Sequence, residues 1–311
     1  MGNARFSSSA YTSYADVNTR RFNAATNAYD IPKSVHETFQ ARKIDPYLDP
    51  RDISIRESCD SEANPESTPI IIALDVTGSM GDIAYKFASE SIGNLMGKIY
   101  EQMPVTDPHL MFMAVGDVAR YDEAPLQVSQ FEADISIAEQ LLKVYVEGGG
   151  GGNNTESYQL PWFFASRYTK TDSFAKRGKK GFIFTIGDEC APDVLTREHI
   201  ERIMGPRPEF GEITELSPES LLADAQKEWD VFHVLVEEGS YCRAFGGRER
   251  AVKSWRDLLG KRLLRLDKKE NLEEVILAAI RVAGGMDPAA AIEMAPENAR
   301  GSINHAFALE G

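Results

Sequence analysis

The stretch Ile70-Ile71-Ile72-Ala73-Leu74-Asp75 is a continuous apolar run that ends in a carboxylate. Such a run predicts a strand that is buried on both faces, because a strand with one solvated face would alternate apolar and polar residues. Strands covered on both faces are typical of parallel sheets in α/β proteins. The stretch therefore predicts the centre of such a sheet.

Similar apolar runs recur along the chain, and segments with helical periodicity separate them. Further strands are predicted at 110–115, 126–131, 181–186, 231–236 and 263–266, with the alternating pattern of 126–131 typical of an edge strand. Helices are predicted at 84–99, 135–146, 158–168, 194–204, 217–228, 248–259 and 271–283. Strands that alternate with helices predict an α/β fold with a doubly wound, mostly parallel sheet and helices on both faces.

Three parts of the chain differ in character. Residues 1–66 are polar and partly irregular, and we expect an N-terminal extension with a short edge strand at 53–55. Residues 67–285 carry the strand and helix pattern of one α/β domain. Residues 286–311 are expected to form a loosely held C-terminal tail.

Composition excludes several classes of function. The 311 residues include 34 Lys and Arg against 48 Asp and Glu, which gives a formal net charge of −14. This balance argues against nucleic-acid and membrane partners, which both require a basic surface. The three cysteines, Cys59, Cys190 and Cys242, lie far apart and lack metal-ligand spacing. They favour a reducing compartment, and we expect a cytoplasmic protein with no membrane span.

Polar side chains follow the predicted strands at three places. Asp75, Thr77 and Ser79 alternate directly after the first strand, Thr155 follows the five glycines 148–152, and Asp188 follows the strand at 181–186. Ligands of open α/β sheets bind at the carboxyl ends of the strands, so we expect these five side chains to meet there. Carboxylates and hydroxyls without His or Cys predict a hard cation, Mg²⁺, with Mn²⁺ or Ca²⁺ as alternatives.

The pattern Asp75-x-Thr77-x-Ser79, then Thr155, then Asp188 resembles the metal-ion-dependent adhesion site (MIDAS) of von Willebrand factor A (VWA) domains. The family pattern is D-x-S-x-S, T and D in this chain order, and the resemblance covers about residues 69–285; Thr77 departs from it by replacing a serine. It implies a Rossmann-like VWA fold in which Thr77 and Ser79 ligate the metal directly. Thr155 would ligate it in some states, and Asp75 and Asp188 would hold bound waters or ligate it.

The resemblance also implies a function. VWA modules of this kind are non-catalytic and bind a protein partner that supplies an Asp or Glu as the last metal ligand. Intracellular bacterial and phage versions often work with AAA+ ATPases of the MoxR type. We therefore expect a protein-binding module rather than an enzyme.

Two other functions stay open. In a metal-dependent phosphoryl hydrolase, Asp75 would be the nucleophile, although Thr77 stands where the D-x-D-x-T pattern has its second Asp. In a phage assembly protein, the metal would be structural and the extensions would make the contacts.

Several of these residues also have a purely structural interpretation. Ser79 is a good helix N-cap, with Asp82 as its capping-box partner. Glu156, Glu189 and Asp117 are expected to be solvated loop acids, with support of the metal ligands as the alternative role.

Overall fold

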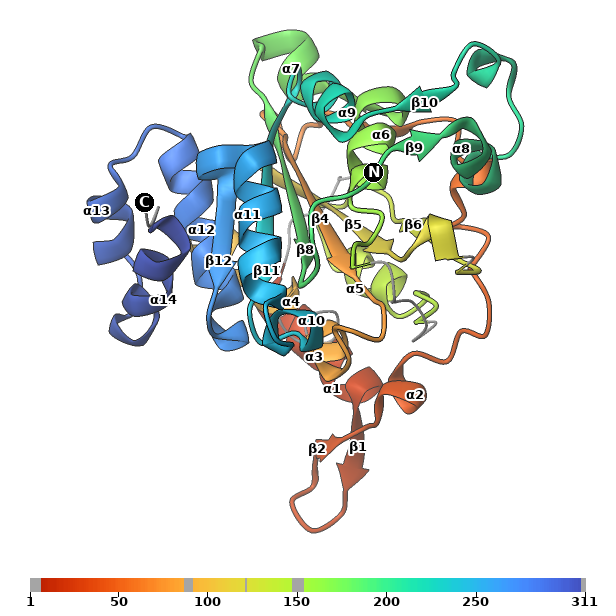
Figure 1. Ribbon diagram of the computed structural model, residues 1–311. Coiled ribbons are helices and arrows are strands. Elements are labelled where there is room, and N and C mark those ends of the chain that lie inside the picture. The colour runs from red at the N-terminus through yellow and green to blue at the C-terminus, as the bar shows by residue number, and fades with distance from the viewer. Residues whose placement is uncertain (1–6, 87–91, 121, 147–153, 309–311) are drawn as a thin grey trace.

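The computed structural model describes residues 7–86, 92–120, 122–146 and 154–308, and its core is a six-stranded sheet (Figure 1). The spatial order is β12-β11-β8-β4-β5-β6. Within the described residues β6 pairs antiparallel with β5, and the other neighbouring pairs are parallel. The six strands are β4 (Thr68–Asp75), β5 (Pro108–Val115), β6 (Leu126–Val128), β8 (Gly181–Gly187), β11 (Trp229–Val236) and β12 (Leu263–Leu266). The predicted α/β class with a mostly parallel sheet is confirmed.

The chain order of the strands reverses next to β4. After β4, the strands β5 and β6 are added on one side of β4. The later strands β8, β11 and β12 are added on its other side. The carboxyl ends of β4 and β8 are therefore adjacent, although the loops that leave them diverge. Such a switch point is where open α/β sheets bind ligands.

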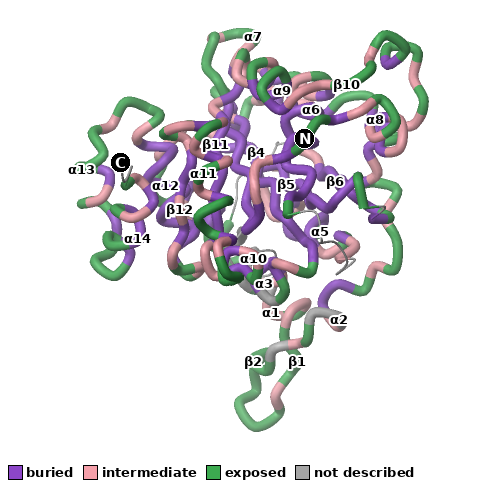
Figure 2. Tube along the Cα trace, viewed as in Figure 1, coloured by how far each residue is buried: buried purple, intermediate pink, exposed green. Residues whose placement is uncertain are grey.

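Helices cover both faces of the sheet, and β4 shows why its residues are uniformly apolar. Ile70, Ile72 and Leu74 pack into one core cluster, whereas Ile71 and Ala73 pack into the other. The first cluster takes in α4 (Ile92–Gln102), α5 (Ser136–Leu141), α12 (Leu272–Ala283), α13 (Pro288–Glu293) and α14 (Glu297–Phe307). The second takes in α6 (Gln159–Tyr168), α8 (Arg197–Met204), α9 (Pro218–Ala225) and α11 (Gly247–Leu259). Figure 2 shows the buried residues concentrated in these layers.

Short elements connect the layers. In the part of the chain that the structure describes, three two-stranded pairs lie outside the main sheet: β1 (Arg20–Asn23) with β2 (Ala28–Pro32), β3 (Arg56–Ser58) with β7 (Thr169–Thr171), and β9 (Leu195–Thr196) with β10 (Glu215–Leu216). The remaining helices are α1 (Ser8–Thr19), α2 (Val35–Thr38), α3 (Asp82–Lys86), α7 (Asp172–Arg177) and α10 (Ser240–Arg243). Single 3-10 turns form at Pro50–Asp52, Val118–Arg120, Pro208–Phe210, Gly260–Arg262 and Lys269–Asn271.

The N-terminal residues form an arm, which we define as α1, β1 and β2 (residues 8–32). The arm projects from the end of the molecule where α3 and α10 lie, and α1 contacts α4 (Figure 1). The predicted edge strand at 53–55 forms slightly later, as β3, and it pairs with β7 rather than with the main sheet. Residues 7–66 therefore hold more regular structure than their composition predicts.

The expectation of a loosely held C-terminal tail is wrong. Residues 288–307 form α13 and α14, and Ala291, Ala299 and Ile303 are completely buried. The two alanines let the helices approach closely, and both helices contact α12. In the described residues, no helix is long and apolar enough to cross a membrane.

Candidate functional site

Four of the five predicted site residues meet at the switch point. Asp75 ends β4, and Asp188 directly follows β8. The Ser79 hydroxyl donates a hydrogen bond of 2.7 Å to Oδ1 of Asp188, and the Thr77 hydroxyl donates one of 2.6 Å to Oδ1 of Asp75. The two hydroxyl oxygens lie 3.3 Å apart. We call Asp75, Thr77, Ser79 and Asp188 the oxygen cluster.

The turn after β4 aims the three side chains of the first loop. The backbone N–H of Thr77 donates a hydrogen bond of 2.8 Å to Oδ1 of Asp75. The Asp75 side chain therefore stabilises a tight turn directly after β4. Helix α3 begins at Asp82, three residues after Ser79. The alternative of Ser79 as a helix N-cap is therefore wrong, and its hydroxyl bridges to the loop after β8 instead.

Backbone contacts hold the second loop in place. Oδ2 of Asp188 accepts a hydrogen bond of 2.8 Å from the backbone N–H of Tyr241, at the start of α10. Gly239 passes so close that a Cβ atom there would lie 2.2 Å from the Cβ of Asp188. A residue without a side chain is thus required where α10 approaches the carboxylate.

Thr155 occupies a different place from the other four. The predicted glycine loop, residues 148–152, lies outside the described residues. Thr155 itself pairs with Cys190, and its hydroxyl lies 3.1 to 3.2 Å from the carbonyl oxygens of Glu156, Cys190 and Ala191. Within the described residues it makes no hydrogen bond with the oxygen cluster. Its role as a ligand stays a prediction.

Tyr158 belongs to the site although the sequence did not single it out. Its hydroxyl donates a hydrogen bond of 2.8 Å to Oδ2 of Asp75, and the side chain is completely buried. A Cβ at Gly187 would lie 2.0 Å from the Tyr158 hydroxyl oxygen, so this glycine admits the tyrosine. With Thr77 on one oxygen and Tyr158 on the other, the Asp75 carboxylate is fixed in orientation.

The expectation that Glu156, Glu189 and Asp117 are solvated loop acids is wrong. Their exposed fractions are 1%, 3% and 2%. Both carboxylate oxygens of Glu156 and one of Glu189 are buried without a hydrogen-bond partner. Loop acids are usually solvated, but these loops fold inward over the end of the sheet.

Burial and mutual repulsion disfavour the charged forms of these acids. Burial, followed by the nearby charge of Asp188, raises the pKa of Asp75 to about 7. Burial, followed by the charge of Asp75, raises the pKa of Glu189 to about 8 and that of Glu156 to about 11. Burial also raises the pKa of Asp188. None of these four acids forms a salt bridge with a described basic side chain.

The donor set fits a hard divalent cation. The oxygen cluster offers carboxylates and hydroxyls alone, which are the ligands that Mg²⁺ prefers. Unneutralised carboxylates at 0% exposure, as in Asp75 and Asp188, are costly without a counter-charge. Among the described residues, no three side chains of His, Cys, Asp or Glu converge as a metal site. A metal here would therefore depend on the hydroxyls of Thr77 and Ser79.

Comparisons with known proteins add a loose structural likeness. No protein-family model matches the chain, and no curated protein matches its sequence. Similar solved structures include the pilus adhesin SpaC from Lactobacillus rhamnosus GG in its open conformation, with a TM-score of 0.45, 9% identity, and coverage of 72% of this chain and 31% of SpaC. The conserved hypothetical protein BatB from Bacteroides thetaiotaomicron has a TM-score of 0.42 and 17% sequence identity. That match covers 70% of this chain and 100% of BatB.

A von Willebrand factor type A protein from Catenulispora acidiphila gives a TM-score of 0.36 at 13% identity, with coverage of 71% of this chain and 44% of that one. This chain thus spans less than a third of SpaC and less than half of the Catenulispora protein.

Proposed function

We propose that the chain is a metal-dependent protein-binding module that uses the oxygen cluster to hold Mg²⁺, or Mn²⁺ or Ca²⁺ in its place. The observation that carries this proposal is the convergence of Asp75, Thr77, Ser79 and Asp188 at the switch point, where neither carboxylate forms a salt bridge with a described basic side chain. The chain order of these residues, which resembles the MIDAS pattern, supports the same function.

Each residue has a defined task in this proposal. A bound cation would supply positive charge and one open coordination position for a carboxylate of the partner. Asp75 and Asp188 offset the charge of the cation, while Thr77 and Ser79 offer neutral oxygen ligands. Tyr158 holds the Asp75 carboxylate in one orientation. Because few charged groups would ligate the cation directly, it would keep attraction for a further acid.

The partner and the location are part of the proposal. The resemblance to intracellular VWA proteins favours an AAA+ ATPase of the MoxR type, with an Asp or Glu of the partner at the metal. The three cysteines are free thiols, which fits a reducing, cytoplasmic location. The arm projects beside α3 and so extends the surface that a partner would meet (Figure 1).

The geometry disfavours the hydrolase alternative. A nucleophilic carboxylate needs an oxygen that can reach the substrate, yet Asp75 is completely buried and hydrogen bonds engage both of its oxygens. Burial also raises its pKa to about 7, so the carboxyl group is only partly ionised at neutral pH. A phosphatase assay with Mg²⁺ should therefore be blank.

The decisive experiment is affinity capture of partners with Mg²⁺ or with EDTA, using the wild-type chain, Ser79→Ala and Asp257→Asn. Asp257 is an exposed acid on α11, far from the cluster in sequence, and it serves as the control for a surface change. We expect wild type and Asp257→Asn to recover the same partners only with Mg²⁺, and Ser79→Ala to recover none. Identical recovery in Mg²⁺ and EDTA would overturn the proposal.

The structural-metal alternative has its own signature. If the cation serves only folding, EDTA should lower the midpoint of thermal unfolding while partner recovery by the remaining folded protein stays unchanged. Measuring both in the same samples separates an adhesive role from a structural one.

A further inference from the structure

The turn after α10 presents a fully exposed aromatic side chain near the oxygen cluster. Phe245 has an exposed fraction of 103%, whereas the other exposed large apolar side chains of the described residues range from 39% to 55%. Single exposed apolar residues are common on protein surfaces, so exposure alone assigns no function. The backbone that carries Phe245 and the charges near it distinguish this residue from the others.

A tight turn holds Phe245 in its exposed position. The N–H of Gly247 donates a hydrogen bond of 2.9 Å to the carbonyl oxygen of Ala244, and Gly246 has φ 71° and ψ 6°. These values fit a type II β-turn in which Phe245 is the first of the two central residues. A Cβ at Gly247 would lie 2.0 Å from the carbonyl oxygen of Tyr241, so the turn packs closely against α10. The turn therefore places the Phe245 ring at its outer corner and not in a core.

The segment that carries this turn is hydrogen-bonded to the oxygen cluster. The N–H of Ser240 donates a hydrogen bond of 3.1 Å to the carbonyl oxygen of Ser79. The N–H of Tyr241 donates one of 2.8 Å to Oδ2 of Asp188, and α10 lies beside α3 at this end of the molecule (Figure 1). Four residues of chain span at most about 14 Å, so Phe245 lies within that distance of Tyr241. A peptide segment that meets the oxygen cluster can therefore also reach Phe245.

Two arginines near Phe245 form no salt bridge with a described acid. Arg243 and Arg250 are both exposed, and the Arg250 guanidinium lies over the Tyr241 ring, 5.7 Å from its centroid. Burial raises the pKa of Asp188, and the positive charge of Arg243 counteracts this in part, which places that charge near the oxygen cluster. We call Tyr241, Arg243, Phe245 and Arg250 the platform. It combines aromatic rings with positive charge on a chain whose net charge is −14.

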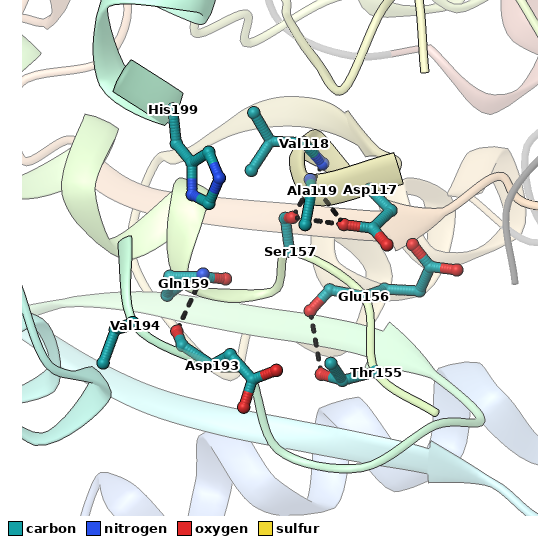
Figure 3. A pocket seen from close by; sticks show the side chains of 10 residues that line it. All are labelled: Asp117, Val118, Ala119, Thr155, Glu156, Ser157, Gln159, Asp193, Val194 and His199. Carbon is teal, nitrogen blue, oxygen red and sulfur yellow. Dashed lines mark hydrogen bonds between the residues drawn. The ribbon is translucent and has the colours of Figure 1, made fainter. Parts of the chain in front are cut away.

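The pocket near the oxygen cluster offers no such positive charge. It has a volume of about 330 Å³ and lies beside the loop after β5, whereas the platform follows β11, beyond β4 and β8 in the sheet order. Figure 3 shows the carboxyl groups of Asp117, Glu156 and Asp193 in its lining, where the described residues include no lysine or arginine. The positive charge that an acidic ligand needs is thus on the platform and not in the pocket.

We propose that the platform binds an acidic segment of the protein partner that carries a large apolar side chain between its carboxylates. The apolar side chain packs on the exposed ring of Phe245, and the carboxylates pair with Arg243 and Arg250. Aromatic residues and arginine are enriched at protein–protein interfaces. That this segment also supplies the metal ligand rests on the proposed function, whereas the platform itself needs no cation. The net charge of −14 disfavours nucleic acid or an anionic membrane in this place.

The test titrates the full-length chain in EDTA with a capped hexapeptide in which glutamate and leucine alternate, and NMR of the protein follows binding. Two comparison peptides change one property each: glutamine replaces glutamate in the first, and serine replaces leucine in the second. We expect saturable binding of the glutamate–leucine peptide, with both others weaker by at least about fivefold, because one loses its charge and the other its apolar contact. Absence of saturable binding, or equal binding of either comparison peptide, would overturn the proposal.

Four variants locate the binding. Phe245→Ser should weaken binding of the glutamate–leucine peptide by about tenfold, and Arg243→Gln should weaken it by about two- to fivefold. The matched controls are Met294→Ser, an exposed apolar residue at the end of α13, and Lys170→Gln, an exposed cation on β7. Neither control should change binding, and circular dichroism checks that each variant is folded. If the controls weaken binding as much as the platform variants, unspecific attraction explains it and the platform does not.

Other occupants of the platform would give different results. Oligothymidylate and vesicles that contain phosphatidylserine are tested in the same buffer. Tighter binding of either than of the glutamate–leucine peptide, lost in Arg243→Gln, would refute the choice of a protein segment. A dimer of the wild-type chain that dissociates in Phe245→Ser, measured by analytical ultracentrifugation, would refute it as well, because a second copy would then cover the ring.

Failure of this proposal is distinguishable from failure of the metal proposal. Mg²⁺ should tighten binding of the glutamate–leucine peptide, because one of its carboxylates then ligates the cation. Ser79→Ala should abolish this gain and leave binding in EDTA unchanged. Platform-dependent binding in EDTA without a gain from Mg²⁺ would contradict the metal proposal alone. A gain from Mg²⁺ with full affinity in Phe245→Ser would contradict the platform alone.

Discussion

A single carboxylate, Asp75, shows how the site balances burial against charge. Asp75 is completely buried, yet its pKa of about 7 lies below the values of about 8 for Glu189 and about 11 for Glu156. Hydrogen bonds from Thr77 and Tyr158 explain the difference, because each donor favours the charged form. Glu156 has no such donor, and its pKa rises furthest.

The first prediction concerns the Tyr158 hydroxyl. Tyr158→Phe removes the donor to Oδ2 of Asp75 and leaves a buried acceptor unsatisfied. We expect the free energy of unfolding to fall by about 1–3 kcal/mol at pH 7. Urea unfolding followed by circular dichroism measures it. Tyr29→Phe removes a hydroxyl from an exposed position on the arm and should cost nothing measurable; equal losses in both variants would contradict the role of Tyr158.

The second prediction concerns pH. In the unfolded chain the side-chain carboxyl groups have a pKa of about 4. In the folded protein the pKa of Asp75 is about 7 and that of Glu189 is about 8. Between the two values the folded state keeps a proton that the unfolded state has lost. Raising the pH through this window therefore favours unfolding, by at most about 1.4 kcal/mol per pH unit for each group. Without divalent cations, stability should fall steadily from pH 5 to pH 8.

Urea unfolding in EDTA at four pH values within that range measures this trend. Saturating Mg²⁺ should flatten or reverse it, because a cation stabilises the ionised carboxylates that rising pH creates. The variant Asp75→Asn removes one of the titrating groups and should reduce the slope in EDTA. A stability that rises with pH in EDTA would show that the buried acids are already neutralised within the protein.

At the scale of elements, apolar runs predicted the strands well because each run is buried on both faces. The runs at 70–75, 110–115, 181–186 and 231–236 all lie within observed strands. The short pairs β9–β10 and β1–β2 were not predicted, because strands of two to five residues are too short to leave an apolar pattern. The helices α13 and α14 were missed because small residues, Ala and Ser, form most of their buried face, beside the larger Ile303.

The same contrast holds within the site. Asp75, Thr77, Ser79 and Asp188 were predicted to meet because they follow strands, and strand order brings strand ends together. Tyr158 sits at the start of a helix in a loop-rich stretch, where only the fold determines which way a side chain points. The signal that could have found it is Gly187, a glycine at the end of a buried strand directly before a candidate ligand, which suggests close approach of another group.

The third prediction belongs to the segment before α10. Gly239→Ala places a methyl group against the Asp188 side chain, while the backbone angle of Gly239, φ −66°, is ordinary for alanine. The substitution therefore tests close packing alone. We expect Asp188 to shift away from Ser79 and the affinity for Mg²⁺ to fall by about 10- to 100-fold, as for other changes that disturb ligand orientation.

Isothermal titration with Mg²⁺ measures this effect. The matched control is Gly301→Ala on α14, where a Cβ meets no neighbouring atom within 4 Å. An alanine there should leave the affinity unchanged and stabilise the helix slightly. Unaltered Mg²⁺ affinity in Gly239→Ala would mean that Asp188 takes no part in holding the cation.

For the whole molecule, the fold separates a packed body from the projecting arm. The body buries two continuous cores on either side of one sheet. The arm, in contrast, exposes large apolar side chains, including Val17, Phe22, Tyr29 and Ile31. Phe22 and Tyr29 contact each other edge to face across the β1–β2 pair, with ring centroids 5.4 Å apart. The arm is thus held by its own contacts more than by the cores of the body.

The fourth prediction follows from this separation. None of the residues from 7 to 34 whose exposure is described is buried, whereas Phe39, just beyond them, belongs to the core. Deleting residues 1–34 removes little buried apolar surface, and hydrophobic stabilisation scales with that surface. We expect the truncated chain to unfold cooperatively, with its thermal midpoint lowered by no more than a few degrees and its response to Mg²⁺ unchanged.

Extending the deletion to residue 39 removes Phe39 and should destabilise the body distinctly. Calorimetry of both chains distinguishes the steps, and a chain lacking 1–34 that fails to fold would show the arm to be part of the core.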